Sequence, residues 1–150
     1  MATISRSIPA PATTPTHLWI VGGLSLLWNS FGAFDYLMTQ LQAEFYMSQF
    51  TEEQLAYFYG FPAWAAAGWA FGVWGAFLGS ILLLMRSKWA VWSFGLSLAG
   101  LAVSSIYTLG ISNGMELMGG VAMYMSAAIW IVAIALFFYA RAQKNHGVLE

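Results

Sequence analysis

The sequence predicts an all-α, polytopic membrane protein: a four-transmembrane-helix bundle with a short external helical cap. Two observations lead to this prediction. Of the 150 residues, 60% are hydrophobic and only 7% are charged, whereas a soluble domain is typically about 25% charged. In addition, four apolar segments are each long enough to cross a hydrocarbon core roughly 30 Å thick. They lie near residues 18–38, 62–85, 89–110 and 119–140.

The basic residues predict the orientation of these spans. All five lie in the N-terminal segment or beside the apolar segments, at Arg6, Arg86, Lys88, Arg141 and Lys144. With four spans these positions fall on one side, and the positive-inside rule makes that side cytoplasmic. Both termini are therefore predicted to be cytoplasmic. The bilayer is the expected partner, and the net charge of −1 argues against nucleic acid.

The segments outside the spans divide into two tails and one long connection. Residues 1–16 contain three prolines and predict a disordered cytoplasmic tail, retained because no cleavage site follows it. The transmembrane domain occupies 17–142, and 143–150 form a second cytoplasmic tail.

The connection over 39–61 contains a capping box, Thr51-Glu52-Glu53-Gln54, which predicts a short helix over 52–59 ending near Gly60. The apolar stripe of the first span predicts that its helix continues to about residue 48. We interpret the connection as an external cap over the bundle, with a solvated loop as the alternative.

Small residues form stripes along three spans. Because lipid supplies no hydrophobic drive to helix pairing, we interpret these stripes as packing faces rather than as a pore lining. They comprise Gly22, Ser25, Asn29, Gly32 and Tyr36; Gly68, Gly72, Gly75 and Gly79; and Ser93, Ser97, Gly100, Ser104 and Tyr107. The tetrapeptide Gly23-Leu-Ser-Leu26 recurs as Gly95-Leu-Ser-Leu98. A duplicated hairpin would produce such a repeat, but we favour chance recurrence within apolar sequence.

Asp35 is the only acidic or basic side chain within the four apolar segments. Such residues often mark function, but a structural bond to an interfacial Tyr or Trp is an equally open interpretation. Buried indole N–H groups also require partners, through packing neighbours or a ligand. The candidate ligand-binding residues are Trp28, Asn29, Asp35, Tyr36, Trp69, Tyr107 and Trp130.

Catalytic and metal-binding patterns are weak. There is no cysteine, and His17 and His146 lie outside the apolar cores, so no catalytic residues and no cofactor are predicted and an enzyme is disfavoured. Methionines gather toward the outer side and could suit Cu(I). Since methionine also fills packing gaps, no metal site is predicted. These methionines are Met38, Met47, Met115, Met118, Met123 and Met125.

The run from Trp28 through Asp35 to Thr39, followed by Phe61-Pro62-Ala-Trp64 and the glycine-rich second span, resembles a group of small uncharacterised proteobacterial four-helix inner-membrane proteins. Some members carry generic transporter-like names. The resemblance implies a bacterial inner-membrane location. Two functions are predicted as alternatives: binding or carrying a small solute or lipid-like molecule near Asp35, or serving as a non-catalytic accessory subunit. Either would suit a homo-oligomer or a larger membrane complex.

Overall fold

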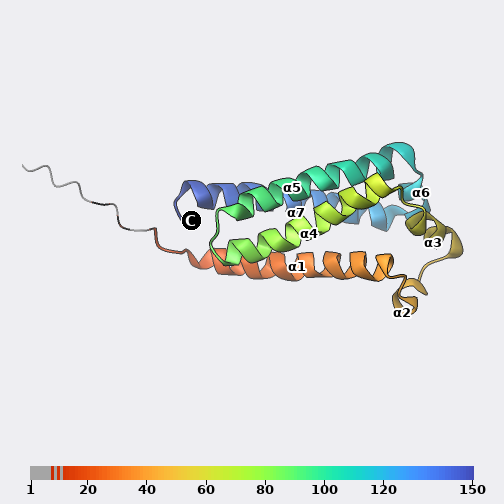
Figure 1. Cartoon of the computed structure of the whole chain (residues 1–150), viewed down its shortest axis with the longest axis horizontal. Helices are drawn as coiled ribbons and strands as arrows, with labels where there is room; N and C mark the ends of the chain where they lie inside the picture. Colours follow the sequence, from red (N-terminus) through yellow and green to blue (C-terminus); the bar gives the residue numbers. More distant parts are fainter. Residues whose placement is uncertain (1–7, 9, 11) are drawn as a thin grey trace, which may run out of the picture.

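Four long helices lie side by side in the computed structural model, which describes residues 8, 10 and 12–150 (Figure 1). They alternate in direction and are α1 (Thr16–Gln40), α4 (Ala63–Leu84), α5 (Trp89–Ser105) and α7 (Gly120–Asn145). Most of the predicted N-terminal tail, including Arg6, lies outside the described residues. The described chain is all-helical.

Within the described residues, three stretches are long and apolar enough to cross a membrane: Ala63–Leu84, Trp89–Ile111 and Gly120–Asn145. The second combines α5 with the π-helix η1 (Ile106–Ile111). Helix α1 has a similar length of 25 residues, but Asn29 and Asp35 lower its hydropathy and it is not among these three. The chain is therefore a helical protein with three candidate membrane spans.

Short helices gather at one end of the bundle, here called the cap end (Figure 1). They are α2 (Glu44–Met47), α3 (Glu52–Tyr59) and α6 (Gly114–Met118). The predicted capping box of α3 is confirmed, since the Gln54 amide donates to Thr51 Oγ1 at 3.2 Å and the Thr51 amide donates to Gln54 Oε1 at 3.0 Å. The helix predicted over 52–59 is confirmed with it.

The predicted continuation of the first helix to residue 48 is wrong, because α1 ends at Gln40. Gln42 adopts a left-handed conformation with φ of 51°. Its amide donates to Thr39 O at 3.2 Å and the Ala43 amide donates to Met38 O at 3.0 Å. This is a Schellman motif, which satisfies the last carbonyls and turns the chain before α2 begins.

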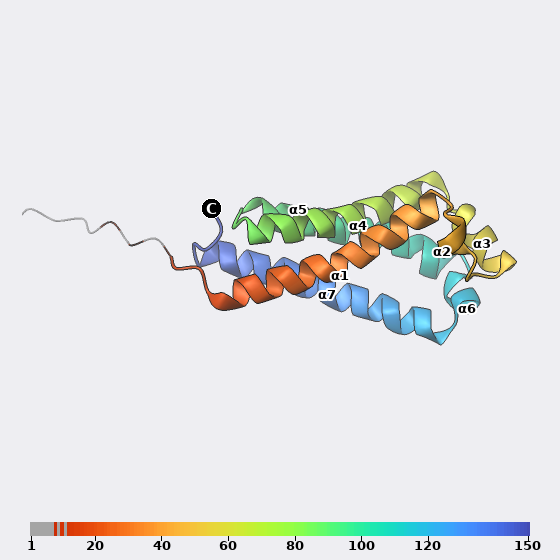
Figure 2. The same ribbon diagram turned by 90° about the horizontal axis from the view of Figure 1, so that it is seen from below.

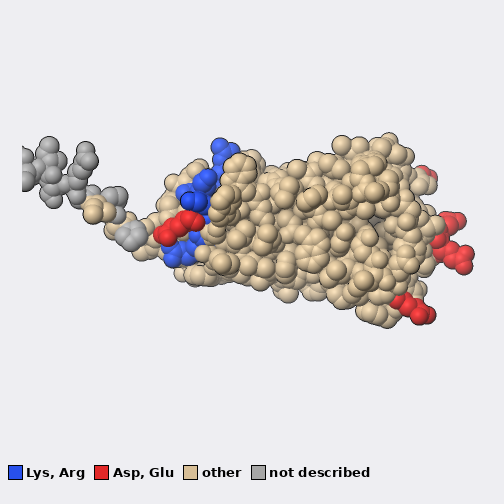
Figure 3. Space-filling model, viewed as in Figure 1, with Lys and Arg blue, Asp and Glu red and all other residues tan. Residues whose placement is uncertain are grey.

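The opposite end is here called the basic end, because it carries Arg86, Lys88, Arg141 and Lys144 (Figure 3). Acidic side chains gather at the cap end, in α2, α3 and α6. The described basic residues therefore lie together at one end, as predicted, and the acidic Glu150 lies among them.

The C-terminal residues pack into the basic end rather than forming the predicted tail. Helix α7 continues to Asn145, and a second Schellman motif at Gly147 (φ 75°) reverses the chain. Val148 and Leu149 are 4% and 5% exposed and join a hydrophobic cluster. The amide of Glu150 donates to Arg86 O at 2.8 Å, so this segment closes the basic end.

The tightest contact in the bundle is the glycine seam, where α4 meets α5. Its residues are Gly68, Gly72, Gly75 and Gly79 of α4 with Ser93, Ser97 and Gly100 of α5. A Cβ atom on Gly100 would lie 2.5 Å from Gly72 N and 2.6 Å from Gly68 O, so only glycine fits. The predicted packing faces of these two helices are confirmed.

The stripe predicted for α1 needs one correction. Gly22, Ser25 and Asn29 are buried, and Gly22 faces α4, because a Cβ atom there would meet the Leu84 side chain. Gly32 lies in open space, since a Cβ atom there would meet nothing within 4 Å. Ala33 takes its place in the buried stripe, as the helical period of 3.6 residues allows.

Candidate functional site

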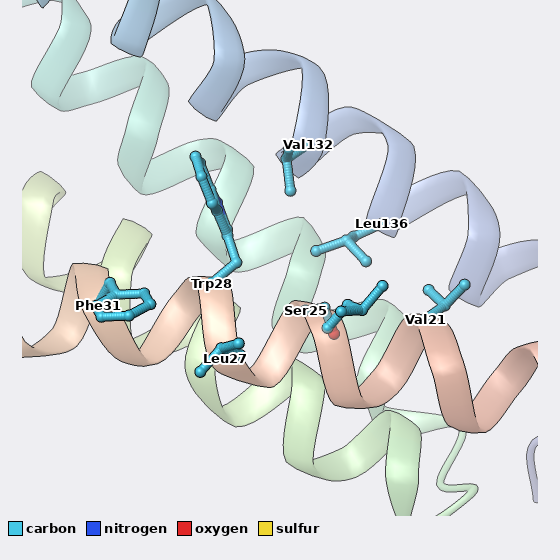
Figure 4. A pocket seen from close by; sticks show the side chains of 8 residues that line it. Val21, Ser25, Leu27, Trp28, Phe31, Val132 and Leu136 are labelled. Carbon is cyan, nitrogen blue, oxygen red and sulfur yellow. The ribbon is translucent and has the colours of Figure 1, made fainter.

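The α1–α7 groove is an open hollow between the first and last long helices. It has a volume of about 480 Å³. Eight side chains line it (Figure 4): Val21, Leu24, Ser25, Leu27, Trp28 and Phe31 of α1 with Val132 and Leu136 of α7. The groove is the candidate site.

The groove exists because α1 and α7 converge only at the basic end. There the His17 ring contacts the Tyr139 hydroxyl at 2.5 Å, and Leu18 is fully buried in the cluster that contains Leu136. Toward the cap end the two helices diverge (Figure 2). The α7 side chains that line this space are Val132 and Leu136, whose branched chains do not allow the close backbone approach that small residues permit.

The walls of the groove are almost entirely apolar. Ser25 supplies a hydroxyl, but that hydroxyl donates to Gly22 O of its own helix at 3.0 Å. Trp28 is 37% exposed and projects from α1 toward α7 (Figure 4). No described group accepts a hydrogen bond from its indole N–H. The groove therefore offers aliphatic surface, one aromatic wall and one available donor.

Asp35 lies outside this groove and is engaged elsewhere. The Tyr46 hydroxyl, beyond the end of α1, donates a hydrogen bond to Asp35 Oδ1, and the Tyr46 ring packs edge-on against Phe34 with centroids 5.6 Å apart. Burial, and then the contact with Asp35, raise the pKa of the Tyr46 phenol. Tyr46 therefore remains a donor at neutral pH, and the pair ties α2 to α1.

Asn29 lies in the interface between α1 and α4. Its Nδ2 donates to Ser80 Oγ at 2.8 Å and to Ala76 O at 3.1 Å. The side chain is largely enclosed, with the whole residue 8% exposed. Asn29 thus holds two helices together and is not presented to the groove.

Three other predicted residues join an aromatic cluster near the cap end. Tyr36 and Trp69 pack edge-on with centroids 5.0 Å apart. Phe61 links them to Tyr107, at 5.8 Å from Trp69 and 4.8 Å from Tyr107. Trp64 also packs against Tyr107 at 5.9 Å. These contacts connect α1, α4 and η1 through ring packing.

Trp130 lies apart from that cluster, on α7. Its indole Nε1 donates to Ser105 Oγ of α5 at 3.2 Å, so the donor of this deep tryptophan is satisfied by a neighbouring helix.

The seven predicted site residues therefore do not form one site. Only Trp28 lines the groove. The aliphatic residues of the groove escaped the sequence analysis because a side chain that lines a groove and one that faces lipid have the same composition and helical period. Among the described residues, no group of three or more His, Cys, Asp or Glu side chains could hold a metal ion.

No family model, curated protein or solved structure matches this chain.

Proposed function

We propose that this protein is a four-span protein of the bacterial inner membrane that binds a lipid-like molecule in the α1–α7 groove. The observation that carries the proposal is the groove itself: about 480 Å³ of open space with almost wholly apolar walls. This volume falls within the range of roughly 300–1,000 Å³ typical of small-molecule sites. Apolar walls select an apolar occupant.

Helix α1 is included as the fourth span because its polar groups are internally satisfied. Asn29 donates to Ser80 and Ala76 of α4, and Asp35 accepts from Tyr46. A satisfied polar group is far less costly in lipid than a free one. With α1 spanning, the basic end lies on one side of the membrane, and the positive-inside rule makes it cytoplasmic together with both termini.

A lipid-like ligand is favoured over a small ion or polar solute. An ionisable side chain within an apolar segment often marks the path of an ion or polar solute, but Asp35 faces Tyr46 and does not line the groove. The Trp28 indole instead provides a flat apolar surface with one donor, which suits an acyl chain next to a polar ester or hydroxyl. We therefore assign Asp35 a structural role.

A second candidate, an accessory subunit of a homo-oligomer or larger membrane complex, is favoured by the part of α7 nearest the cap end. There Val121 is 78% exposed, Tyr124 80% and Met123 61%. A partner helix would cover this surface without entering the groove, so the two candidates involve different residues.

The test uses a photoactivatable phosphatidylcholine with a diazirine on its acyl chain, mixed with the full-length protein in mild detergent. We expect crosslinks on α1 near Trp28 and on α7 near Val132. Val132→Trp fills the groove and should reduce these crosslinks severalfold. Ile131→Trp is the matched control, because Ile131 is 68% exposed and does not line the groove. Crosslinks spread evenly over all long helices would contradict the proposal.

A further inference from the structure

A second hollow, here called the basic cleft, lies between α5 and α7 at the basic end. Its volume is about 660 Å³. It is lined by Val91, Trp92, Gly95 and Leu96 of α5 and by Phe137, Arg141, Lys144 and Asn145 of α7. It shares no residue with the α1–α7 groove.

The basic cleft is polar at one end and apolar at the other. Helix α5 leads away from the basic end, so Gly95 and Leu96 lie one turn deeper than Val91 and Trp92. Helix α7 leads toward that end, so Phe137 is deep and Lys144 is near the rim. A headgroup followed by an acyl chain has this same order of polarity.

The two cations of the cleft are available for an anion. Within the described residues the one ion pair joins Arg86 to Glu150 at 3.7 Å, and neither Arg141 nor Lys144 pairs with an acid. Both lie on the last turns of α7, three residues apart, which places them on neighbouring positions of one face. Figure 3 shows the basic side chains gathered at this end of the molecule.

The helix dipoles do not produce the positive potential of the basic cleft. Helix α5 begins at Trp89 and α7 ends at Asn145 at the same end of the bundle, so a positive and a negative dipole end lie side by side and largely offset each other. The positive potential of the cleft therefore comes from Arg141 and Lys144. Trp92, 68% exposed, lies at the rim, where tryptophan commonly meets lipid headgroups.

Gly95 leaves room for the apolar part of a ligand. A Cβ atom at this position would approach the Phe137 ring at 3.4 Å, so the glycine forms the floor between α5 and α7. A longer side chain there would occupy the cleft itself.

We propose that the basic cleft binds one anionic phospholipid, with its phosphate between Arg141 and Lys144 and an acyl chain passing over Gly95 against Phe137. Basic pockets between membrane helices recognise anionic headgroups through this combination of charge and apolar depth. The inference requires that the bundle lies in a membrane, but it does not depend on what occupies the α1–α7 groove.

The first arm of the test measures headgroup selectivity. Full-length protein in mild detergent is titrated with phosphatidylglycerol or phosphatidylcholine, and bound lipid is counted by native mass spectrometry. We expect phosphatidylglycerol to bind more tightly. Arg141→Gln and Lys144→Gln should each lower the affinity for phosphatidylglycerol roughly fivefold and leave the affinity for phosphatidylcholine unchanged. Equal affinity of the wild-type protein for the two lipids would overturn the proposal.

Lys88→Gln is the charge control, since Lys88 is at the same end of the molecule but does not line the cleft. We expect this substitution to lower the affinity for phosphatidylglycerol by less than twofold. A loss of affinity as large as that of Lys144→Gln would show general attraction of anionic lipid to a basic surface, and it would contradict a specific site in the basic cleft.

The second arm tests the shape of the site and the source of the phosphate. Gly95→Leu should abolish selective binding of phosphatidylglycerol. Gly23→Leu is the matched control, because Gly23 begins the other copy of Gly-Leu-Ser-Leu and a Cβ atom there would meet nothing within 4 Å. It should leave the binding unchanged. Glycerol phosphate should fail to displace phosphatidylglycerol at equal concentration, since it lacks the acyl chain. Full displacement, or unchanged binding by Gly95→Leu, would show a phosphate site without a lipid component and contradict the proposal.

Discussion

The glycine seam and the α1–α7 groove show two opposite ways in which long apolar helices of this chain lie against each other. In the seam, backbone meets backbone, and serine hydroxyls of α5 donate across it: Ser93 Oγ to Gly75 O at 2.7 Å and Ser97 Oγ to Gly72 O at 2.6 Å. In the groove, branched and aromatic side chains keep α1 and α7 apart and leave about 480 Å³ open.

If the bundle lies in a membrane, as proposed above, the difference shows what small residues contribute when no hydrophobic drive operates between helices. Helices in lipid associate through close van der Waals contact and interhelical hydrogen bonds, and both require small side chains at the contact. The seam supplies them at successive turns, so the backbones of α4 and α5 approach closely along it. Toward α1, helix α7 instead presents Val132 and Leu136, and the groove remains open on that side.

The largest effect is expected from placing a bulky side chain in the glycine seam. Gly100→Leu would place a Cβ atom 2.5 Å from Gly72 N, where no rotamer can relieve the clash and α5 must move away from α4. Overpacking of this kind costs about 1–3 kcal/mol and occasionally more. Since the clash is with backbone, we expect about 3 kcal/mol or failure to fold, measured by unfolding in mixed detergent micelles.

Gly32→Leu is the matched control for that variant. It introduces the same side chain in a long helix where a Cβ atom would meet nothing within 4 Å. We expect a change of less than about 0.5 kcal/mol, as for surface substitutions generally. Equal losses of unfolding free energy in Gly32→Leu and Gly100→Leu would show that leucine disturbs the helices themselves. Close packing in the seam would then not explain the effect of Gly100→Leu.

A smaller effect is expected at the contact between α1 and α4, which positions one wall of the groove. Asn29→Leu keeps the number and branching of the side-chain heavy atoms but removes the donors to Ser80 and Ala76. The Ser80 hydroxyl keeps its own acceptor, Ala76 O, at 3.0 Å, so the loss is limited. We expect a destabilisation of about 1–2 kcal/mol, near the upper range for polar contacts between membrane helices.

Ser30→Ala is the control for Asn29→Leu, because the Ser30 hydroxyl donates to Leu26 O within α1 at 2.6 Å and holds no second helix. Its unfolding free energy should stay within about 0.5 kcal/mol of wild type. If Asn29→Leu changes the unfolding free energy as little as Ser30→Ala does, hydrogen bonds do not hold α1 against α4. Packing alone would then position this wall of the groove.

Much of the fold could be predicted from local sequence rules. The glycine and serine spacing indicated the α4 and α5 faces because close packing in lipid has few chemical solutions. Thr51 and Gln54 indicated the start of α3, and Gly60 indicated its end, through patterns that depend only on neighbouring residues. The end of α1 at Gln40 was missed because a Schellman motif is usually marked by glycine, whereas Gln42 occupies the left-handed position here.

The candidate site could be predicted only in part, because it depends on distances between helices. Trp28 was named, yet Val132 and Leu136 look like any lipid-facing aliphatic residues in the sequence. Asp35 attracted attention as an isolated acid, but its partner, Tyr46, lies eleven residues away, in a segment whose path is set by the turn at Gln42. A pairing across such a turn has no periodic signature.

The smallest expected effect compares one serine in each copy of the repeated Gly-Leu-Ser-Leu sequence. Ser97, in the second copy, donates across the seam to Gly72 O at 2.6 Å. Ser25, in the first copy, donates to Gly22 O of its own helix at 3.0 Å and lines the groove. The two serines share their flanking residues and their burial, at 3% and 5% exposed. They differ in whether the hydrogen bond joins two helices.

Ser97→Ala should therefore destabilise the protein by about 0.6 kcal/mol, the average measured for bonds between membrane helices. Ser25→Ala removes a bond that competes with the helix backbone rather than joining helices, so its effect should be close to zero. Because both variants remove the same atom from the same local sequence, their difference isolates the interhelical bond. Replicate unfolding titrations in one detergent mixture would resolve it. A loss at Ser25 equal to that at Ser97 would mean that the hydroxyls act within their own helices, leaving glycine contact as the sole source of the seam's strength.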